Sequence, residues 1–293
     1  MKPALPLAAW IGLILGSASV LIARESTEDF SRALHLYESR HYSEARTCFA
    51  RLAVAHTNDP ALDFYLGRLA LWFDDAHEAL AYLERAARNS PQDARIQNAL
   101  GDAYGLMAQQ AGLLAKLAWA KRCLAAYQHA IQLAPDNVAY RWSLVGYYCM
   151  APFIAGGGHD KAFAEAAAIR KLDLASGRIA FATLFLAENN NDAAFGEFDA
   201  VLNNTPDDFL ALYQIGRCAA MSGEQLSRGA AALRRCLRLT PPAGDGMPTH
   251  ASAHFRLGNI LEKQGDQVGA NAEYEMASKE EPDFRPAKIA LKN

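Results

Sequence analysis

The sequence predicts an all-α protein, a solenoid of about seven helix-turn-helix units in which the third unit has elongated helices. Two series of small residues lead to this prediction. The first recurs at steps of 34 residues or more and consists of Ala33, Gly67, Gly101, Gly146, Ala182, Gly216 and Gly258. The second follows it by 12 residues or more, at Ala45, Ala79, Cys123, Ala162, Ala194, Gly229 and Ala270. A period of this length indicates one small structural unit that is stacked many times.

Each unit is expected to be a pair of antiparallel helices, because Gly or Ala in both series lets the two helices approach closely where they cross. A large apolar residue usually stands four positions after the second small residue, and we expect it to fill the space toward the next unit. These residues are Phe49, Leu83, Tyr127, Phe198, Leu233 and Tyr274, with Ala166 as the exception. A proline ends most units because it cannot continue a helix, at Pro91, Pro135, Pro206, Pro241 and Pro282.

The third unit departs from the basic length. Gly101 and Cys123 stand 22 residues apart, and the surplus residues between them are strong helix formers. We therefore expect both helices of this unit to be longer than their neighbours. The hairpin should turn near Gly112 and project about 7 Å beyond the adjacent units.

These residue types resemble the pattern of the tetratricopeptide repeat family, which is W-x2-L-G-x2-Y, then A-x3-F, then P. The clearest units are Leu66-Gly67 with Ala79, Leu83, Ala86 and Pro91, and Leu257-Gly258 with Ala270, Tyr274, Ala277 and Pro282; Trp142 and Val145-Gly146 supply the tryptophan variant. The resemblance covers residues 27–290 and implies a right-handed α-solenoid, a superhelix with a concave inner surface. The motifs AYG and AQ in the third unit and AP..AGG..KA in the fourth are similar to those of a subgroup of exported bacterial members that lack an established activity.

The fourth unit contains three consecutive glycines, Gly156 to Gly158, between its two helices. A phosphate-binding P-loop would need a preceding strand and a Ser or Thr after Lys161, and the sequence has neither. We therefore predict a structural turn, with Asp160 as the N-cap of the second helix. Anion binding by the backbone amides of the loop at residues 156–161 remains the alternative.

The N-terminal residues predict export. Residues 4–23 carry no charge, follow Lys2 and precede an acidic stretch. This pattern predicts that residues 1–23 are a cleavable signal peptide or, alternatively, an uncleaved membrane anchor. Residues 24–293 would then form the solenoid, with residues 283–293 as a C-terminal capping helix. We expect this part to be periplasmic or otherwise extracytoplasmic, either soluble after cleavage or anchored in the inner membrane.

The charge balance and the cysteines exclude several classes of function. The 29 basic and 32 acidic residues give a net charge of −3 without a basic run, so nucleic acid is not expected as a partner. Five widely spaced cysteines, Cys48, Cys123, Cys149, Cys218 and Cys236, include no CxxC pair. We interpret them as buried free thiols, although a disulfide framework is the alternative in an exported protein.

No catalytic or metal-binding pattern stands out in the sequence, and we predict neither an enzyme nor a cofactor. His250 and His254 are four residues apart, which is a spacing that two metal ligands can have, but no Glu lies between them as in HExxH. We expect these two histidines to pack or to cap helices. Pairs of carboxylates lie in turns between the predicted helices, where they are usually solvated.

The concave surface is the predicted binding site. In the family, this surface is lined by the first helix of each unit, and the resemblance transfers the lining to specific positions of this chain. The candidate partner-binding residues are Phe30, Tyr37, Phe64, Arg68, Arg95, Asn98, Tyr140, Tyr147, Tyr213, Arg217 and Phe255. Tyr and Arg are common at the centres of protein interfaces. The Lys, Asn and Arg clamp that some members use for a carboxylate is not reproduced. The alternative is that several of these aromatic side chains only pack between helices.

The sequence thus predicts a non-enzymatic interaction scaffold in the bacterial cell envelope, which binds a peptide segment of a partner protein in its concave groove. The membrane is expected as a partner only through an uncleaved N-terminal segment. One alternative is an enzyme, or an accessory of one, that acts on cell-wall or peptide material through the loop at residues 156–161. The other is a self-associating structural component.

Overall fold

A computed structural model describes residues 28–244 and 246–292, and all regular secondary structure within these ranges is helical. The predicted signal peptide or anchor at residues 1–23 lies outside the described residues. None of the helices in the described part of the chain combines the length and the apolar character that a membrane span requires.

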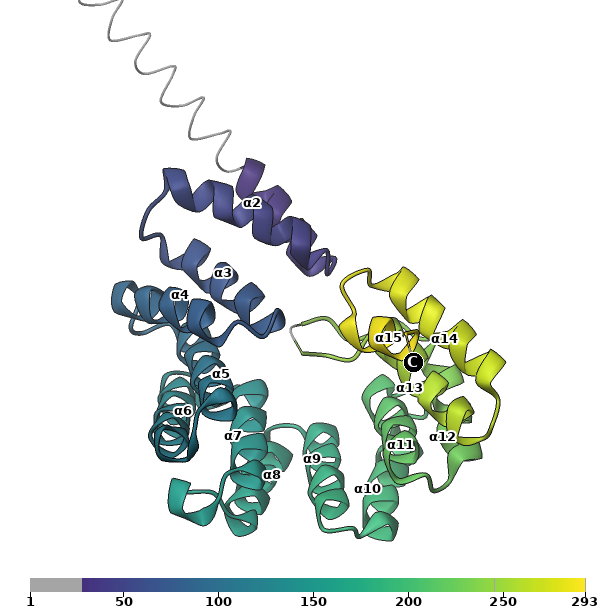
Figure 1. Cartoon of the computed structure of the whole chain (residues 1–293). Helices are drawn as coiled ribbons and strands as arrows, with labels where there is room; N and C mark the ends of the chain where they lie inside the picture. The colour runs from purple at the N-terminus through teal and green to yellow at the C-terminus, as the bar shows by residue number, and fades with distance from the viewer. Residues whose placement is uncertain (1–27, 245, 293) are drawn as a thin grey trace, which may run out of the picture.

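The helices form the seven predicted pairs, which follow one another in a right-handed superhelix (Figure 1). The first pair joins the helical segment 28–38 to α2 (Tyr42–Ala55). The others join α3 (Pro60–Trp72) to α4 (Ala76–Asn89), α5 (Ala94–Gln110) to α6 (Leu113–Leu133), α7 (Val138–Met150) to α8 (His159–Leu172), α9 (Leu174–Ala187) to α10 (Asn191–Asn204), α11 (Phe209–Ser222) to α12 (Leu226–Cys236), and α13 (His250–Lys263) to α14 (Gln267–Glu280). The 3₁₀ helix η1 (Phe153–Ala155) lies between α7 and α8, and α15 (Arg285–Ala290) follows the seventh pair.

Short polar side chains start most of these helices. Asp59, Asp93 and Asp208 precede α3, α5 and α11, and each carboxylate accepts a hydrogen bond from a backbone N–H of the first turn. This arrangement satisfies amides that have no partner within the helix. The chain therefore marks the beginning of each unit locally, independently of how the units stack.

The predicted glycines let the two helices of a unit touch. A Cβ atom added to Gly67 would lie 2.5 Å from Cγ of Leu83, and one added to Gly258 would lie 2.4 Å from Cε1 of Tyr274. Gly101 and Gly216 have the same relationship to Tyr127 and Leu233. The large residue thus fills the space over the glycine of its own unit, whereas we had expected it to face mainly the next unit.

The fourth unit differs from the prediction. Gly146 is exposed, and a Cβ atom added to it would have no neighbour within 4 Å. Its neighbour Val145 is 2% exposed and belongs to the same core cluster as Ala166. Leu66 and Leu257, at the position of Val145 in other units, are equally buried, so this unit differs in that Gly146 lies outside the helix crossing and that Ala166 replaces the usual large residue.

The third unit has the elongated helices that were predicted. The helix α5 contains 17 residues and α6 contains 21, whereas α3 and α7 contain 13 each. The hairpin turns at Ala111 and Gly112, which provide the C-cap of α5 and the N-cap of α6.

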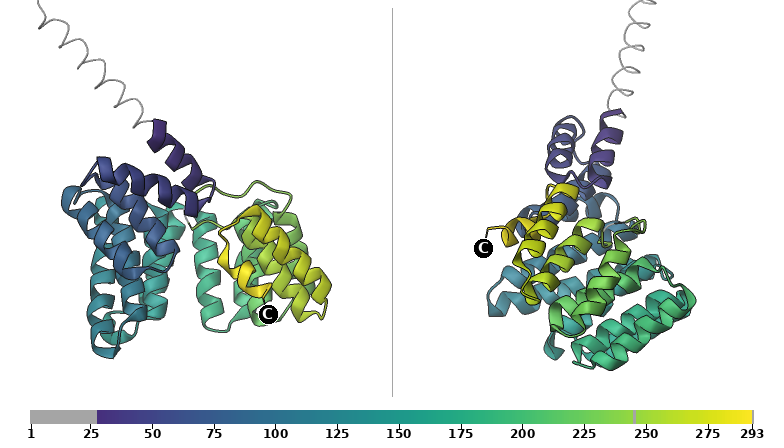
Figure 2. Two further views of the ribbon diagram at one scale, coloured as in Figure 1. Left: turned by 45° about the horizontal axis from the view of Figure 1, so that its top comes forward. Right: turned by 90° about the vertical axis from the view of Figure 1, so that its right-hand side faces the viewer.

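The superhelix curves until its two ends meet, as the views in Figure 2 also show. The Arg40 guanidinium donates to the Met247 carbonyl at 3.1 Å, and the backbone N–H and the hydroxyl of Ser43 both donate to the Asp283 carboxylate at 2.9 and 2.8 Å. An ion pair joins Asp74 to Arg285 at 2.6 Å. We call these the end-to-end contacts, and they turn the solenoid into a closed ring.

Candidate functional site

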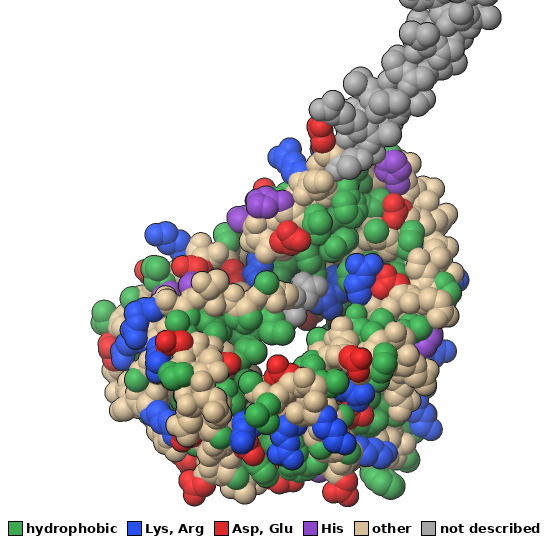
Figure 3. Space-filling view, turned by 180° about the vertical axis from the view of Figure 1, so that it is seen from behind, with side chains coloured by type: hydrophobic (Ala, Val, Ile, Leu, Met, Phe, Trp, Pro, Cys, Tyr) green, Lys and Arg blue, Asp and Glu red, His purple; other side chains and the backbone are tan. Residues whose placement is uncertain are grey.

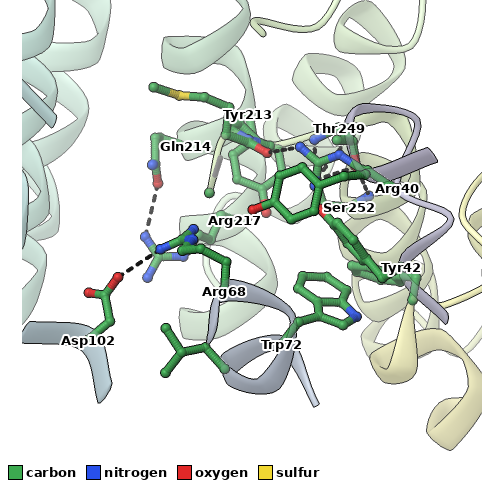
Figure 4. A pocket seen from close by; sticks show the side chains of 16 residues that line it. Arg40, Tyr42, Arg68, Trp72, Asp102, Tyr213, Gln214, Arg217, Thr249 and Ser252 are labelled. Atoms are coloured by element: carbon green, nitrogen blue, oxygen red, sulfur yellow. Dashed lines mark hydrogen bonds and ion pairs between the residues drawn. The ribbon is translucent and has the colours of Figure 1, made fainter. Parts of the chain in front are cut away.

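A pocket of about 580 Å³ lies inside the ring, where the first two units face the last two (Figure 4). We call it the central pocket. Its walls come from segments far apart in the chain, and the lining includes Tyr37, Arg40, Tyr42, Arg68, Trp72, Asp102, Tyr213, Gln214, Arg217, Thr249 and Ser252. The pocket exists only because the superhelix brings its two ends together. Seen from behind, the molecular surface is hollowed in the middle of the ring (Figure 3).

Three arginines and one aspartate are among the described residues that line the central pocket. Arg68 forms an ion pair with Asp102 at 2.9 Å, and Arg40 lies 3.6 Å from the Glu281 carboxylate. Arg217 donates to the amide oxygen of Gln214 at 3.0 Å, and within the described residues it has no carboxylate partner. The pocket thus presents a guanidinium group that can receive an acidic group of a ligand.

Aromatic rings lie beside the arginines in the walls of the central pocket. The rings of Tyr37 and Tyr42 meet edge to face at 5.5 Å, and Tyr42 lies 4.6 Å from the ring of Trp72. Tyr213 from α11 is 8% exposed and closes the far side. Rigid aromatic side chains next to an arginine are the usual composition of a protein-binding hot spot.

Four predicted site residues converge here, namely Tyr37, Arg68, Tyr213 and Arg217. They lie in the first, second and sixth units, which the sequence alone does not place next to one another. Sequence reasoning missed Arg40, Tyr42 and Trp72, because they stand in or beside the turns between helices. The family pattern assigns inner-surface positions only to the middle of each first helix.

Three predicted aromatic residues pack between helices instead. Phe30 lies 5.7 Å from the ring of Phe49, and Phe255 lies 5.7 Å from the ring of Phe284. Phe64 is buried, with the guanidinium of Arg95 5.6 Å from its ring centre. Phe30, Phe64 and Phe255 therefore pack between helices and do not line the central pocket, which was the alternative interpretation of the sequence.

The remaining predicted residues lie away from the central pocket. Arg95 is exposed and pairs with Asp93 at 2.6 Å, while the side-chain oxygen of Asn98 has no hydrogen-bond partner among the described residues. Tyr140 is half-buried, and burial, with the Asp93 charge as a second cause, raises the pKa of its phenol. Tyr147 lines a different cavity.

This second cavity, of about 660 Å³, lies between the long α5–α6 hairpin and the α7–η1 segment. We call it the apolar cavity, because its walls are formed mainly by alanine, leucine, aromatic and glycine residues, among them Gly105, Leu117, Ala120, Trp142 and Gly146. It borders both irregular units of the solenoid. Asp102 lines it as well as the central pocket.

The glycine loop of the fourth unit is a structural turn. The amides of Gly156, Gly157 and Gly158 donate to the carbonyls of Phe153, Pro152 and Tyr148, at 2.8, 3.2 and 2.9 Å. Lys161 donates to the Gly156 carbonyl at 2.8 Å. The amides of the three glycines and the Lys161 ammonium are thus used within the loop, whereas no side chain caps the first-turn amides of α8.

The beginning of α8 corrects the predicted cap. Gly158, not Asp160, is the N-cap residue, and its φ of 148° lies in a region that favours glycine. A Cβ atom on Gly157 would lie 1.8 Å from the Ala151 carbonyl oxygen. Both glycines are therefore explained by the backbone path.

The two histidines and the cysteines form no site together. His250 contacts the Leu239 carbonyl at 2.8 Å and His254 pairs with Glu273 at 2.6 Å, so the two rings have separate partners. In the part of the chain that the structure describes, no group of three or more His, Cys, Asp or Glu side chains is arranged to hold a metal ion. All five cysteines are free, with Cys123, Cys218 and Cys236 buried and the other two half-buried.

The helix pairs define an α-solenoid that closes around a pocket, and comparisons with known proteins agree with this fold. Residues 179–244 and 219–283, in the fifth to seventh units, match the family model described as "Tetratricopeptide repeat". Over these residues the chain is similar to the tetratricopeptide repeat family. No curated protein matches it.

Three solved structures share the fold. Yeast Tom70 superposes with a TM-score of 0.61 at 15% identity, over 91% of this chain and 56% of that chain. A thermophilic tetratricopeptide repeat protein of Thermus thermophilus superposes with a TM-score of 0.56 at 21% identity, over 71% of this chain and 99% of that chain. A tetratricopeptide repeat protein of Parabacteroides merdae superposes with a TM-score of 0.55 at 16% identity, over 92% of this chain and 98% of that chain. At these identities the likeness concerns the fold alone.

Proposed function

We propose that this protein is a non-enzymatic interaction scaffold that holds a segment of a partner protein in the central pocket. The observation that carries the proposal is the convergence of Tyr37, Arg68, Tyr213 and Arg217 from distant units in one pocket. Concave surfaces of repeat solenoids commonly bind other proteins. The side chains here are of the types that dominate such interfaces.

The chemistry of the pocket favours a segment with an acidic side chain. Arg217 faces the pocket with Gln214 as its polar contact, and the neighbouring Arg68 already neutralises Asp102. A carboxylate next to Arg217 would form a charge-assisted hydrogen bond. The tyrosine and tryptophan rings would cover the apolar part of the same segment.

We also propose that the scaffold acts in the cell envelope, either as a soluble periplasmic protein or anchored in the inner membrane. This proposal rests on the uncharged residues 4–23 and their charged flanks. Fractionation of cells that express the full chain, with mass determination of the N-terminus, tests it. Recovery of the protein with an intact N-terminus in the cytoplasm would contradict it.

A site-specific crosslinking experiment tests the pocket. A photo-crosslinking amino acid replaces Gln214, which lines the pocket, or Arg95, which is exposed outside it. We expect a discrete crosslinked partner only from position 214, and we expect the additional change Arg217→Ala to reduce its yield at least tenfold while helicity is unchanged. Equal crosslinking from both positions, or an unaltered yield with Arg217→Ala, would overturn the assignment.

A further inference from the structure

The apolar cavity has properties that the proposed function does not use. It is separate from the central pocket except at Asp102, and it borders only the third and fourth units. Its volume of about 660 Å³ falls within the range of sites for small ligands, roughly 300–1,000 Å³.

The two tyrosines in its walls already have hydrogen-bond partners. The hydroxyl of Tyr127 donates to Asp102 at 2.7 Å, and that of Tyr147 donates to the Ala155 carbonyl at 2.6 Å. Cys123 is buried, and this burial raises the pKa of its thiol to about 12, so the side chain stays uncharged at neutral pH. The buried part of the walls thus offers almost no free hydrogen-bonding group to a ligand, whereas Gln109 and Lys116 lie at exposed positions of the lining.

Because the buried walls have so few free hydrogen-bonding groups, they favour a ligand whose buried part is apolar. An extended peptide would bring N–H and C=O groups into the cavity without partners, which costs free energy for each buried group. A helix satisfies its own backbone, but two turns with side chains fill roughly 800 Å³, so a helix would bury only part of its surface in a cavity of about 660 Å³. A hydrocarbon chain has no polar group to satisfy.

The mouth of the cavity adds a charge and an apolar rim. Leu113, Leu114 and Met150 are 85%, 92% and 79% exposed and line the cavity. Lys116 lines it too, and within the described residues it forms no ion pair. Asp102, the one carboxylate among the described lining residues, is paired with Arg68, and residues 103–135 contain no Asp or Glu. The mouth therefore attracts an anionic group.

We propose that the apolar cavity binds a single-chain anionic amphiphile, such as a long-chain fatty acid. The hydrocarbon chain would lie between α5, α6 and α7, with the acid group at the mouth next to Lys116. The exposed leucines would cover the part of the chain near the entrance. This site does not depend on the function proposed for the central pocket.

Displacement of a fluorescent polyene fatty acid from the purified protein tests the proposal. Decanoate, dodecanoate and tetradecanoate should compete with affinities that rise about fourfold for each added methylene, until the cavity is full. The methyl ester of the same acid should bind several-fold more weakly than the acid. The Lys116→Gln variant should bind the acid and its methyl ester with equal affinity.

Two glycine variants provide a matched pair. Gly146→Leu places a side chain into the apolar cavity, where a Cβ atom meets no neighbour within 4 Å. Gly196→Leu makes the same change on α10, where a Cβ atom also meets no neighbour but no cavity is filled. We expect Gly146→Leu to weaken fatty-acid binding at least tenfold and Gly196→Leu to leave it unchanged.

Absence of saturable binding, or equal binding by the two glycine variants, would overturn the proposal. Binding of the ester as tightly as the acid would overturn the role of Lys116. Partner crosslinking from position 214 is measured separately, so failure of one site does not affect the test of the other.

Discussion

The carboxylate of Asp74 lies 2.6 Å from the guanidinium of Arg285, although 211 residues separate them in the chain. Together with the hydrogen bonds of Ser43 and Arg40, this ion pair holds the first two units against the C-terminal segment. The contacts of Asp74 and Ser43 are exposed, and exposed pairs contribute roughly 0.2–1 kcal/mol each, whereas the contact of Arg40 is partly buried. The ring is therefore closed by weak contacts that can be removed without unfolding the units.

The first prediction concerns this closure. The double variant Asp283→Ala, Arg285→Ala removes contacts to Ser43 and Asp74, and the ring should open while the helix pairs remain intact. Small-angle X-ray scattering should show a larger radius of gyration with unchanged circular dichroism. Arg95→Ala, which breaks an exposed pair within one unit, is the control. A radius of gyration equal to that of the wild type would contradict the role of the end-to-end contacts.

The second prediction compares two helical glycines. Gly67→Ala places a methyl group 2.5 Å from Leu83, and overpacking of this kind costs roughly 1–3 kcal/mol. Gly146→Ala meets no neighbour, so the better helix propensity of alanine should stabilise the protein by up to about 1 kcal/mol. Thermal denaturation should thus show opposite changes in the midpoint. A lower midpoint for Gly146→Ala would show that this glycine has another structural role.

The third prediction concerns a buried carboxylate. Asp63 on α3 is 1% exposed, and it accepts two hydrogen bonds from Arg85 on α4, one of them at 2.7 Å. Arg85→Ala would leave this charge without its partner, and we expect a loss of about 3 kcal/mol, the lower end for buried pairs, because Arg85 is partly exposed. Urea denaturation measures the change.

A surface pair serves as the comparison for Arg85. Arg228 and Asp199 form an ion pair between exposed side chains. Arg228→Ala should therefore cost no more than about 1 kcal/mol. A similar loss for the two arginine variants would mean that the burial of Asp63 adds nothing to the energy of its pair.

The fourth prediction concerns alkaline pH. Burial raises the pKa of Cys123 and Cys236 to about 12 and that of Cys218 to about 11, from an ordinary value of 9.0. The thiols then ionise in the unfolded chain before they ionise in the folded one. Their contribution to stability is complete below about pH 9 and is lost as the pH rises toward 11 to 12.

Urea denaturation between pH 8 and pH 11 measures this loss. Each buried thiol should contribute a slope of up to about 1.4 kcal/mol per pH unit above pH 9. In the Cys236→Ala variant, the slope of the unfolding free energy against pH should be smaller by the contribution of one thiol. This holds whatever the substitution does to the absolute stability. An unaltered slope would mean that the Cys236 thiol ionises as easily in the folded protein as in the unfolded chain.

The helix pairs could be predicted because each depends on residues close in the chain. Gly67 and Leu83 are 16 positions apart, and their packing follows from size alone. The fourth unit shows where this reasoning fails. Val145-Gly146 matches the motif and Val145 is buried as Leu66 is, but Gly146 is exposed and Ala166 stands where other units carry a large residue. Without a large residue in the second helix, the first helix has no need of a glycine at the crossing, and Ala166 was visible in the sequence as the exception.

The central pocket could be predicted only in part. Tyr37 and Arg217 were assigned to the inner surface, but nothing local to either residue indicates that they share one pocket. Their proximity depends on the small rotation between successive units, which accumulates over the whole solenoid. Arg40 and Trp72 enter the pocket for the same reason, so an assignment that considers each unit separately omits them.

Asp102 stands in the wall between the two cavities, with one oxygen bonded to Arg68 and the other to Tyr127. A ligand in the central pocket that attracts Arg68 would leave the negative charge of Asp102 less neutralised on the side of the apolar cavity. An anionic amphiphile would then bind there less tightly, and by thermodynamic reciprocity it would weaken the first ligand by the same factor. Two ligands that never touch would thus compete through a single shared carboxylate.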